Sequence, residues 1–287
     1  MKHARAKEST QPTVEDVRQY WESHPLLSFE LANSGSASYF EALDAIKRSD
    51  SDAFAMGYWN FQGYPGKQVL DVGCGPGWLT VQYAMGGAQV SSVDLTRKAV
   101  ELCEAHLRLR GVTADVRQGN AEELPFGDDT FDMVFSSGVL HHTPDTYKTF
   151  QECFRVLKPG CAAKITLYRK GILHHPFVFA LTRWVMLLLG VKHPGADLAK
   201  ESSDVNNFIR MYDGASNPVG IGKTDEEWAA LFSAAGFQVT GVERHFFPLR
   251  FVPSALPFRG ALHRLLDRWL GTMAYFSLQK PASRDAC

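Results

Sequence analysis

The chain is poor in cysteine and has no cysteine pair of the kind that binds zinc. Its 5 cysteines are Cys74, Cys103, Cys153, Cys161 and Cys287, an odd number without a C-x-x-C spacing. Both facts argue against a disulfide framework and against a structural zinc site. A reducing compartment suits such a chain, so we expect a cytoplasmic location.

The chain also has no excess of charge of either sign. Lys and Arg number 30 and Asp and Glu number 31, so the formal net charge is −1. A protein that binds nucleic acid over a broad surface normally carries a basic excess, so we expect no nucleic-acid partner. With 45% hydrophobic and 21% charged residues, the composition is that of a globular protein and excludes a disordered or collagen-like chain.

No hydrophobic run is long enough to cross a bilayer. The most apolar stretch, Phe177–Gly190, contains Arg183 and falls short of the ~20 residues that a spanning helix needs. The N-terminal stretch Met1–Asp16 is polar and lacks the apolar segment of a signal peptide. We therefore expect no stable membrane insertion and interpret Phe177–Gly190 as a core or lid helix.

Sequence patterning divides the chain into four parts. Residues 1–56 show helical periodicity and predict an N-terminal helical cap. Residues 57–170 alternate apolar runs with helical patterns and predict the ligand-binding core. Residues 171–223 are too long for an ordinary connection of ~2–6 residues, so we interpret them as an inserted lid. Residues 224–287 resume the alternation and predict the C-terminal part of the same domain.

The alternation of short apolar runs and amphipathic helices predicts an α/β fold, with a parallel sheet covered by helices on both faces. Thr224 and Glu227 form a predicted capping box at the start of one late helix. Pro159-Gly160 is expected to end the predicted helix Thr146–Leu157. The predicted strands are Val69–Val72, Val90–Val93, Met133–Ser136, Ala162–Tyr168, Phe237–Phe247 and Ala274–Gln279, and the two central helices are Arg97–Arg110 and Thr146–Leu157.

A glycine-rich loop follows the first predicted strand. Gly73, Gly75 and Gly77 let the backbone turn sharply and approach a ligand without interference from a Cβ atom. Asp94 ends the next strand about 20 residues later, where an acidic residue can accept both hydroxyls of a ribose. The pattern therefore predicts a ligand with an adenosine-like part.

Two residues around this loop argue against a dinucleotide. Trp78 stands where dinucleotide-binding loops have a small residue that allows close packing of helix and strand. Asp71, an anion directly before the loop, favours a ligand that carries positive charge over one that carries phosphates. A nicotinamide oxidoreductase is therefore the weaker hypothesis.

Five segments of the chain, in order from about Gly66 to Tyr168, resemble the class I S-adenosylmethionine-dependent methyltransferases, especially those that act on quinone precursors and natural products. The resemblance implies a doubly wound, mostly parallel seven-stranded sheet, S-adenosylmethionine as cofactor, and methyl transfer to an oxygen, nitrogen or carbon of a small molecule. Asn120 departs from the aspartate usual in the family, and Cys161 replaces a glycine. The five segments are Val69–Leu79, Ser92–Leu95, Gly119–Phe126, Phe131–His142 and Phe154–Gly160.

The resemblance also implies where the cofactor binds. It assigns the cofactor to the glycine-rich loop, to the acidic residue after the second strand, and to the segments around the adenine and after the fourth strand. The residues that match these positions are Asp71, Gly73, Cys74, Gly75, Gly77, Asp94, Leu95, Asn120, Ala121, Glu122, Ser136 and Ser137.

The candidates on the acceptor side lie at the ends of the fourth and fifth strands. His141 or His142 is a candidate base, because histidine titrates near neutral pH. Tyr168 and Arg169 are expected at the same rim, where Arg169 could hold a carboxylate or phosphate of the substrate. No third ligand accompanies the histidine pair that opens the insertion, so we expect no metal.

Aromatic residues leave the character of the acceptor open. The apolar start of the insertion would suit an aromatic or lipid-like acceptor, but it favours core packing or a homodimer interface. Tyr20, Trp21 and Tyr39 either close over the cofactor or belong to the core. Two further functions stay as alternatives: a methyltransferase that acts on a protein or RNA, and a non-catalytic module that binds S-adenosylmethionine.

Overall fold

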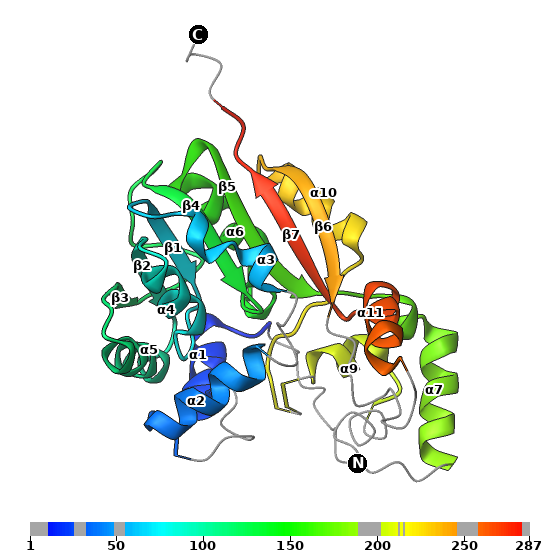
Figure 1. Ribbon diagram of the computed structural model, residues 1–287. Helices are drawn as coiled ribbons and strands as arrows, with labels where there is room; N and C mark the ends of the chain where they lie inside the picture. Colours follow the sequence, from blue (N-terminus) through cyan, green and yellow to red (C-terminus); the bar gives the residue numbers. More distant parts are fainter. Residues whose placement is uncertain are drawn as a thin grey trace, which may run out of the picture.

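A seven-stranded sheet with the order β3-β2-β1-β4-β5-β7-β6 organises the molecule (Figure 1). This computed structural model describes residues 11–25, 33–48, 55–188, 202–211, 213–214, 216–245 and 258–282. Every pair of neighbouring strands is parallel except those that involve β7, which runs antiparallel to both β5 and β6. The strands are β1 (Gln68–Val72), β2 (Gln89–Asp94), β3 (Asp115–Gln118), β4 (Phe131–Ser137), β5 (Leu157–Tyr168), β6 (Gln238–His245) and β7 (Met273–Gln279). The predicted doubly wound, mostly parallel seven-stranded fold is confirmed.

Helices cover both faces of this sheet. On one face the core is built from residues such as Phe150 of α6 and Trp228 and Phe232 of α10. On the other face Leu43 of α2 and Tyr83 of α4 pack against the strands. The helices are α1 (Val14–Ser23), α2 (Ala37–Ile46), α3 (Ala55–Trp59), α4 (Trp78–Met85), α5 (Arg97–Arg110), α6 (Thr146–Val156), α7 (Pro176–Leu188), α9 (Val205–Arg210), α10 (Asp225–Ala234) and α11 (Arg259–Leu270), with 3₁₀ turns η2 (Phe61–Gly63), η3 (Leu140–His142) and η4 (Ile172–His174).

The central strands are buried on both faces, which explains why they read as continuous apolar runs rather than as alternating ones. In β1, Val69, Leu70 and Val72 are each 0% exposed. The predicted capping box of α10 is present: the Glu227 carboxylate accepts the N–H of Thr224, and the Thr224 hydroxyl accepts the N–H of Glu227. This cap fixes the start of α10, the helix that leads the chain back into the sheet at β6.

Two sequence expectations about the sheet were wrong. The strand β3 was not predicted, because it is a four-residue edge strand with Val116 as its single apolar residue. Pro159 and Gly160 do not end α6, which already stops at Val156, but lie inside β5. The register of β5 against β4 shifts there, and Gly160 has a φ of +78°, so the two residues form an irregularity at the start of the strand.

Several N-terminal and inserted elements gather at the end of the sheet where the parallel strands finish (Figure 1). These are α1 and α2 from residues 1–56, and α9 from residues 171–223. Part of each segment, including residues 1–10, 26–32, 49–54 and 189–201, lies outside the described residues, as does Cys287. Among the helices that are described, none has the length and apolar character needed to cross a membrane.

Candidate functional site

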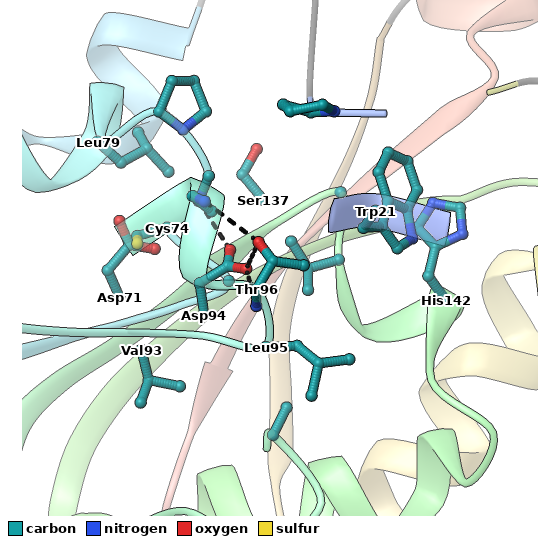
Figure 2. Close-up of a pocket in the computed structure, with 18 of the residues that line it drawn as sticks. Trp21, Asp71, Cys74, Leu79, Val93, Asp94, Leu95, Thr96, Ser137 and His142 are labelled. Atoms are coloured by element: carbon teal, nitrogen blue, oxygen red, sulfur yellow. Dashed lines mark hydrogen bonds between the residues drawn. The ribbon is translucent and has the colours of Figure 1, made fainter. Parts of the chain in front are cut away.

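A cavity of about 290 Å³ lies over the carboxyl ends of β1, β2, β4 and β5 (Figure 2). Its wall begins at the glycine-rich loop after β1 and ends at side chains from α1, η3 and the segment after α9. Ligands of open α/β sheets bind at this edge, because the loops that follow the strands converge there. Eleven of the predicted site residues line the cavity: Asp71, Gly73, Cys74, Gly75, Asp94, Leu95, Asn120, Ala121, Ser137, His142 and Tyr168.

The glycines of the loop differ in what they face. Gly73, Gly75 and Gly77 have φ values of +83°, +50° and +78°, a region that favours glycine. A Cβ atom at Gly75 would meet nothing within 4 Å, whereas at Gly73 it would meet Val139 and at Gly77 it would meet Cys103. Gly75 therefore opens the loop toward a ligand, while Gly77 allows α4 to pack on α5 and does not line the cavity.

Asp94 joins the loop to the second strand (Figure 2). Its Oδ2 accepts the N–H of Gly75 at 3.0 Å, and its Oδ1 accepts both the N–H and the hydroxyl of Thr96 at 2.9 Å. Burial raises the pKa of Asp94, and these hydrogen bonds oppose the rise. A carboxylate has about four acceptor sites, so Asp94 can accept a further hydroxyl without giving up a contact.

Asp71 is the second carboxylate on this wall and is 1% exposed. Its Oδ2 accepts the hydroxyl of Thr80 at 2.7 Å, and that hydroxyl also meets the hydroxyl of Ser92 at 2.8 Å. Burial raises the pKa of Asp71 to about 7, against the lowering effect of the Thr80 hydrogen bond. Lys47 from the end of α2 lines the same cavity, so the wall carries charges of both signs.

Two other residues predicted for the cofactor lie behind the wall rather than on it. Ser136 is fully buried and donates its hydroxyl to the carbonyl of Val72 at 2.7 Å. The Glu122 carboxylate accepts the N–H of Asp145 at 2.9 Å, and so anchors the start of α6. Both side chains hold the backbone of the site in place, so we do not assign them contacts with a ligand.

The acceptor end of the cavity contains three polar side chains in contact. Nδ1 of His142 lies 2.7 Å from the carbonyl oxygen of Val219, and Nε2 lies 3.2 Å from Oδ2 of Asp213. The Tyr168 hydroxyl donates to the same Oδ2 at 2.5 Å. Burial acts to raise the pKa of Asp213, but the hydrogen bond and charge of His142 and the Tyr168 hydroxyl bring it below its ordinary value.

His141, the other candidate base, does not line the cavity. It is 0% exposed, and its ring packs 4.2 Å from the ring of His142 and 4.0 Å from that of Tyr168 between centroids. Burial, and then the neighbouring His142, lowers the pKa of His141 well below its ordinary value. His141 therefore fills space as a neutral ring, and the role of a candidate base does not suit it.

Arg169 lies outside the cavity, contrary to the expectation that it faces the substrate. Its guanidinium donates to Asp225 at 2.9 Å and to the carbonyl of Gly271, and Arg244 pairs with the same carboxylate at 2.6 Å. The side chains of Arg169 and Asp225 are 12% and 8% exposed. Because β5 ends just before it, Arg169 turns toward the start of α10 and joins that helix to the sheet.

Replacing Arg169 by methionine should therefore destabilise the protein without affecting ligands. Loss of one partner from a mostly buried ion pair leaves Asp225 with Arg244 alone, and we expect the free energy of unfolding to fall by about 1–3 kcal/mol. Denaturant titration measures this change. Unaltered stability together with weakened acceptor binding would return Arg169 to the substrate site.

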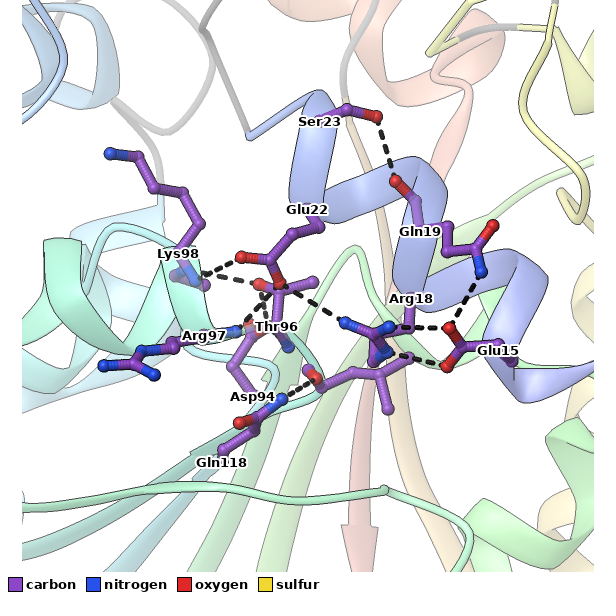
Figure 3. Close-up of polar contacts among 12 residues, drawn as sticks. Glu15, Arg18, Gln19, Glu22, Ser23, Asp94, Thr96, Arg97, Lys98 and Gln118 are labelled. Atoms are coloured by element: carbon purple, nitrogen blue, oxygen red, sulfur yellow. Dashed lines mark hydrogen bonds and ion pairs between the residues drawn. The ribbon is translucent and has the colours of Figure 1, made fainter.

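Helix α1, near the N-terminus of the chain, covers one side of the cavity. Trp21 lines it and packs edge-on against His142, with 5.1 Å between the ring centroids. Glu22 fixes the helix in place, because its carboxylate accepts the N–H groups of Arg97 and Lys98 at the start of α5, at 3.0 and 3.1 Å (Figure 3). Tyr39, by contrast, is 1% exposed and belongs to the core.

Several residues that line the cavity are not predicted from the sequence, and the most important are Lys47, Thr96 and Asp213. Thr96 follows Asp94 closely, and its place could have been inferred from the strand end. Nothing in the sequence marks Asp213, which stands in an aperiodic segment after α9. Among the described residues, no group of three potential ligands is arranged to hold a metal ion.

Comparison with known proteins places this site in context. Residues 70–163 match the family described as "Methyltransferase domain". The chain is 30% identical over 208 residues to the "Ubiquinone biosynthesis O-methyltransferase" of Alkalilimnicola ehrlichii, a match that covers 70% of this chain and 78% of that protein. The protein of the same name from Pseudomonas fluorescens is 33% identical over 152 residues, where the match covers 52% of this chain and 60% of the relative.

Solved structures share the fold at lower identity. The cyclase SpnF superposes with a TM-score of 0.58 at 19% identity, and covers 95% of this chain and 98% of its own. The YcgJ protein from Bacillus subtilis superposes with a TM-score of 0.55 at 19% identity, and covers 80% of this chain and 99% of its own. At such identity these similarities describe the fold, and one fold supports many reactions.

Proposed function

We propose, since the chain belongs to the class I S-adenosylmethionine-dependent methyltransferases, that it methylates a hydroxyl oxygen of a small aromatic molecule. S-adenosylmethionine is the cofactor, and when bound it supplies a methyl group that is activated for transfer. One observation carries the proposal. A single cavity joins the open glycine loop and Asp94 to a pocket with aromatic walls, so that a cofactor and an acceptor can meet inside it.

The residues on the cofactor side fit this cofactor. The open side of Gly75 gives room for close approach, and Asp94 has capacity for a ribose hydroxyl. Asp71 and Lys47 carry opposite charges on one wall, a combination that suits the ammonium and carboxylate groups of the methionine part. Asn120 and Ala121 line the part of the wall that we assign to the adenine.

The acceptor class follows from the other end of the cavity and from the relatives. Trp21, Tyr168 and Tyr275 line that end and provide aromatic surface for a ring. The relatives are O-methyltransferases by name, which supports oxygen as the acceptor atom. Methyl transfer is accelerated when both reactants are held in line and water is kept out, and Trp21 of α1 covers the cavity in the way that this requires.

Labelled-methyl transfer to catechol and a set of related phenols tests the proposal. We expect label in the phenol with purified protein, and none when S-adenosylhomocysteine is added in excess. Calorimetric binding of S-adenosylhomocysteine, without binding of NAD, should accompany it. Label that enters only protein or RNA from a cell extract would contradict the acceptor class, and binding without transfer to any acceptor would leave a non-catalytic module.

The affinity for S-adenosylhomocysteine should depend on pH through Asp71. A group with a pKa of about 7 is mostly protonated at pH 6, and only its carboxylate attracts the ammonium of the ligand. Affinity should therefore rise with pH through 7 and level off above it, with a change of up to ~10-fold per unit below pH 7. Lys47, Asp94, His142 and Asp213 also line the cavity and are unchanged in Asp71→Asn, so titrations of that variant serve as the control and should be flat.

The homodimer, one of the alternatives for the apolar start of the insertion, and the cytoplasmic location stay predictions. Light scattering of the purified protein measures its oligomeric state, and cell fractionation measures its location. The aromatic acceptor is our choice over a lipid-like one, because the aromatic rings line the cavity itself.

A further inference from the structure

Asp213 lies at the acceptor end of the cavity and belongs to no element that the sequence marks as functional. We propose that Asp213 accepts the proton of the acceptor hydroxyl through its Oδ1 atom. This inference rests on the proposed function and adds to it the group that receives the proton and the chemical class of the acceptor.

The carboxylate of Asp213 is held on one side and open on the other. Both of its side-chain contacts, from Nε2 of His142 and the hydroxyl of Tyr168, use Oδ2. Among the described residues, Oδ1 has no hydrogen-bond donor. The side chain is 24% exposed and lines the cavity, so a hydroxyl of the acceptor can reach Oδ1.

His142 is poorly placed to take the proton itself. The carbonyl of Val219 only accepts hydrogen bonds, so the contact of 2.7 Å requires a hydrogen on Nδ1. The other nitrogen, Nε2, faces the carboxylate of Asp213 rather than the cavity. Both nitrogens are thus engaged by the protein, and the ring orients Asp213 instead of competing with it.

The backbone around Asp213 is fixed from two other elements. The Tyr20 hydroxyl of α1 donates to the carbonyl of Asp213 at 2.5 Å. The next residue, Gly214, has a φ of +131°, and a Cβ atom there would lie 2.5 Å from the same hydroxyl. The N–H of Ile221 donates to the carbonyl of His141 at 3.0 Å, which ties the end of this segment to η3. These contacts hold the carboxylate at a defined place on the wall.

The proton transfer balances in atoms and in charge. A lone pair of the acceptor oxygen forms the bond to the methyl carbon, and the electron pair of the carbon–sulfur bond stays on sulfur. The proton of the hydroxyl moves to Oδ1 of Asp213. The positive charge lost at sulfur is regained as a proton on the carboxylate, so the total charge inside the cavity does not change.

The environment of Asp213 limits which acceptors can react. Its contacts with His142 and Tyr168 hold its pKa below the ordinary value, which keeps it ionised at neutral pH and makes it a weak base. A weak base serves a phenol, whose pKa is near ~10, far better than an aliphatic alcohol. Trp21, Tyr168 and Tyr275 line the cavity and suit the ring of such a phenol, so we assign phenolic hydroxyls as the acceptor class.

Asp213→Asn is the decisive variant, because asparagine keeps the shape and can still accept hydrogen bonds from Tyr168 and His142. With catechol as the acceptor we expect kcat to fall by ~100-fold or more, on the scale of general-base catalysis. With 4-nitrocatechol, which is largely ionised near neutral pH, the loss should shrink to a few-fold. The Kd for S-adenosylhomocysteine should stay within a few-fold of the wild-type value.

The matched control is Asp128→Asn, which removes a 74% exposed carboxylate that pairs with Arg155 and precedes β4, at the end of that strand opposite the cavity. Asp128→Asn should leave the rates of methylation of catechol and of 4-nitrocatechol unchanged. Thermal melting checks that Asp128→Asn and Asp213→Asn are both folded. An equal loss with both phenols, or no loss with either, would overturn the role of Asp213 while leaving the methyltransferase proposal intact. Wild-type protein that methylates no phenol would overturn both proposals.

Discussion

Replacing Asp94 by alanine should weaken binding of S-adenosylhomocysteine by about 10- to 100-fold, the scale of a hydrogen bond to a charged group. The change removes the carboxylate that we assign to the ribose. It also removes the acceptor of the Gly75 N–H, so the loop loses its tie to the end of β2. Isothermal calorimetry measures the loss directly.

Two further variants separate these effects of Asp94. Asp94→Asn keeps one acceptor oxygen, which can serve the N–H of Gly75 or that of Thr96 but not both, and should recover part of the affinity. Glu104→Gln removes an exposed carboxylate on the neighbouring helix α5 and should leave the affinity unchanged. If Asp94→Ala binds as tightly as the wild-type protein, our placement of the ribose is wrong.

Replacing Gly77 by alanine should reduce the stability of the protein strongly. The new Cβ atom would lie 2.6 Å from Sγ and 2.9 Å from Cα of Cys103, and the latter is backbone that cannot turn aside. The positive φ adds about 1–2 kcal/mol of strain, and the overlap adds a similar or larger amount. We expect Tm to fall by about 10 °C in thermal melting.

Gly75→Ala is the matched comparison for Gly77→Ala. Both glycines have a positive φ, but a Cβ atom at Gly75 enters the open cavity. We expect this variant to melt within about 5 °C of the wild-type protein and to lose at least ~10-fold in affinity for S-adenosylhomocysteine, because the methyl group occupies the space of the ligand. Equal melting temperatures for the two variants would contradict the packing role of Gly77.

The sequence predicted those elements whose signals are local. Asp94 and the alternate glycines are read from a strand end and a spacing, and the buried strands are read from apolar runs that two covered faces require. The edge strand β3 carries no such run, since Val116, which packs against the cluster that includes Cys103 and Leu107 of α5, is its single apolar residue. The irregular start of β5 escaped prediction because Pro159 and Gly160 usually end elements rather than begin them.

The acceptor side was harder to predict because tertiary contacts decide it. His141 and His142 are adjacent in sequence and both buried, and only their packing shows that His142 lines the cavity while His141 does not. Arg169 is held away from the cavity by Asp225, a partner that lies 56 residues away in the chain. Asp213 reaches the cavity through contacts with α1 and β5, and no periodic pattern encodes such contacts.

One measurement tests the central claim most directly. Purified protein is incubated with methyl-labelled S-adenosylmethionine and catechol, and the products are separated and analysed by mass spectrometry. We expect a labelled methyl ether on the phenol oxygen, formed in proportion to enzyme and abolished by S-adenosylhomocysteine. Absence of label from catechol and the related phenols, with label found in protein or RNA when a cell extract is supplied, would contradict it.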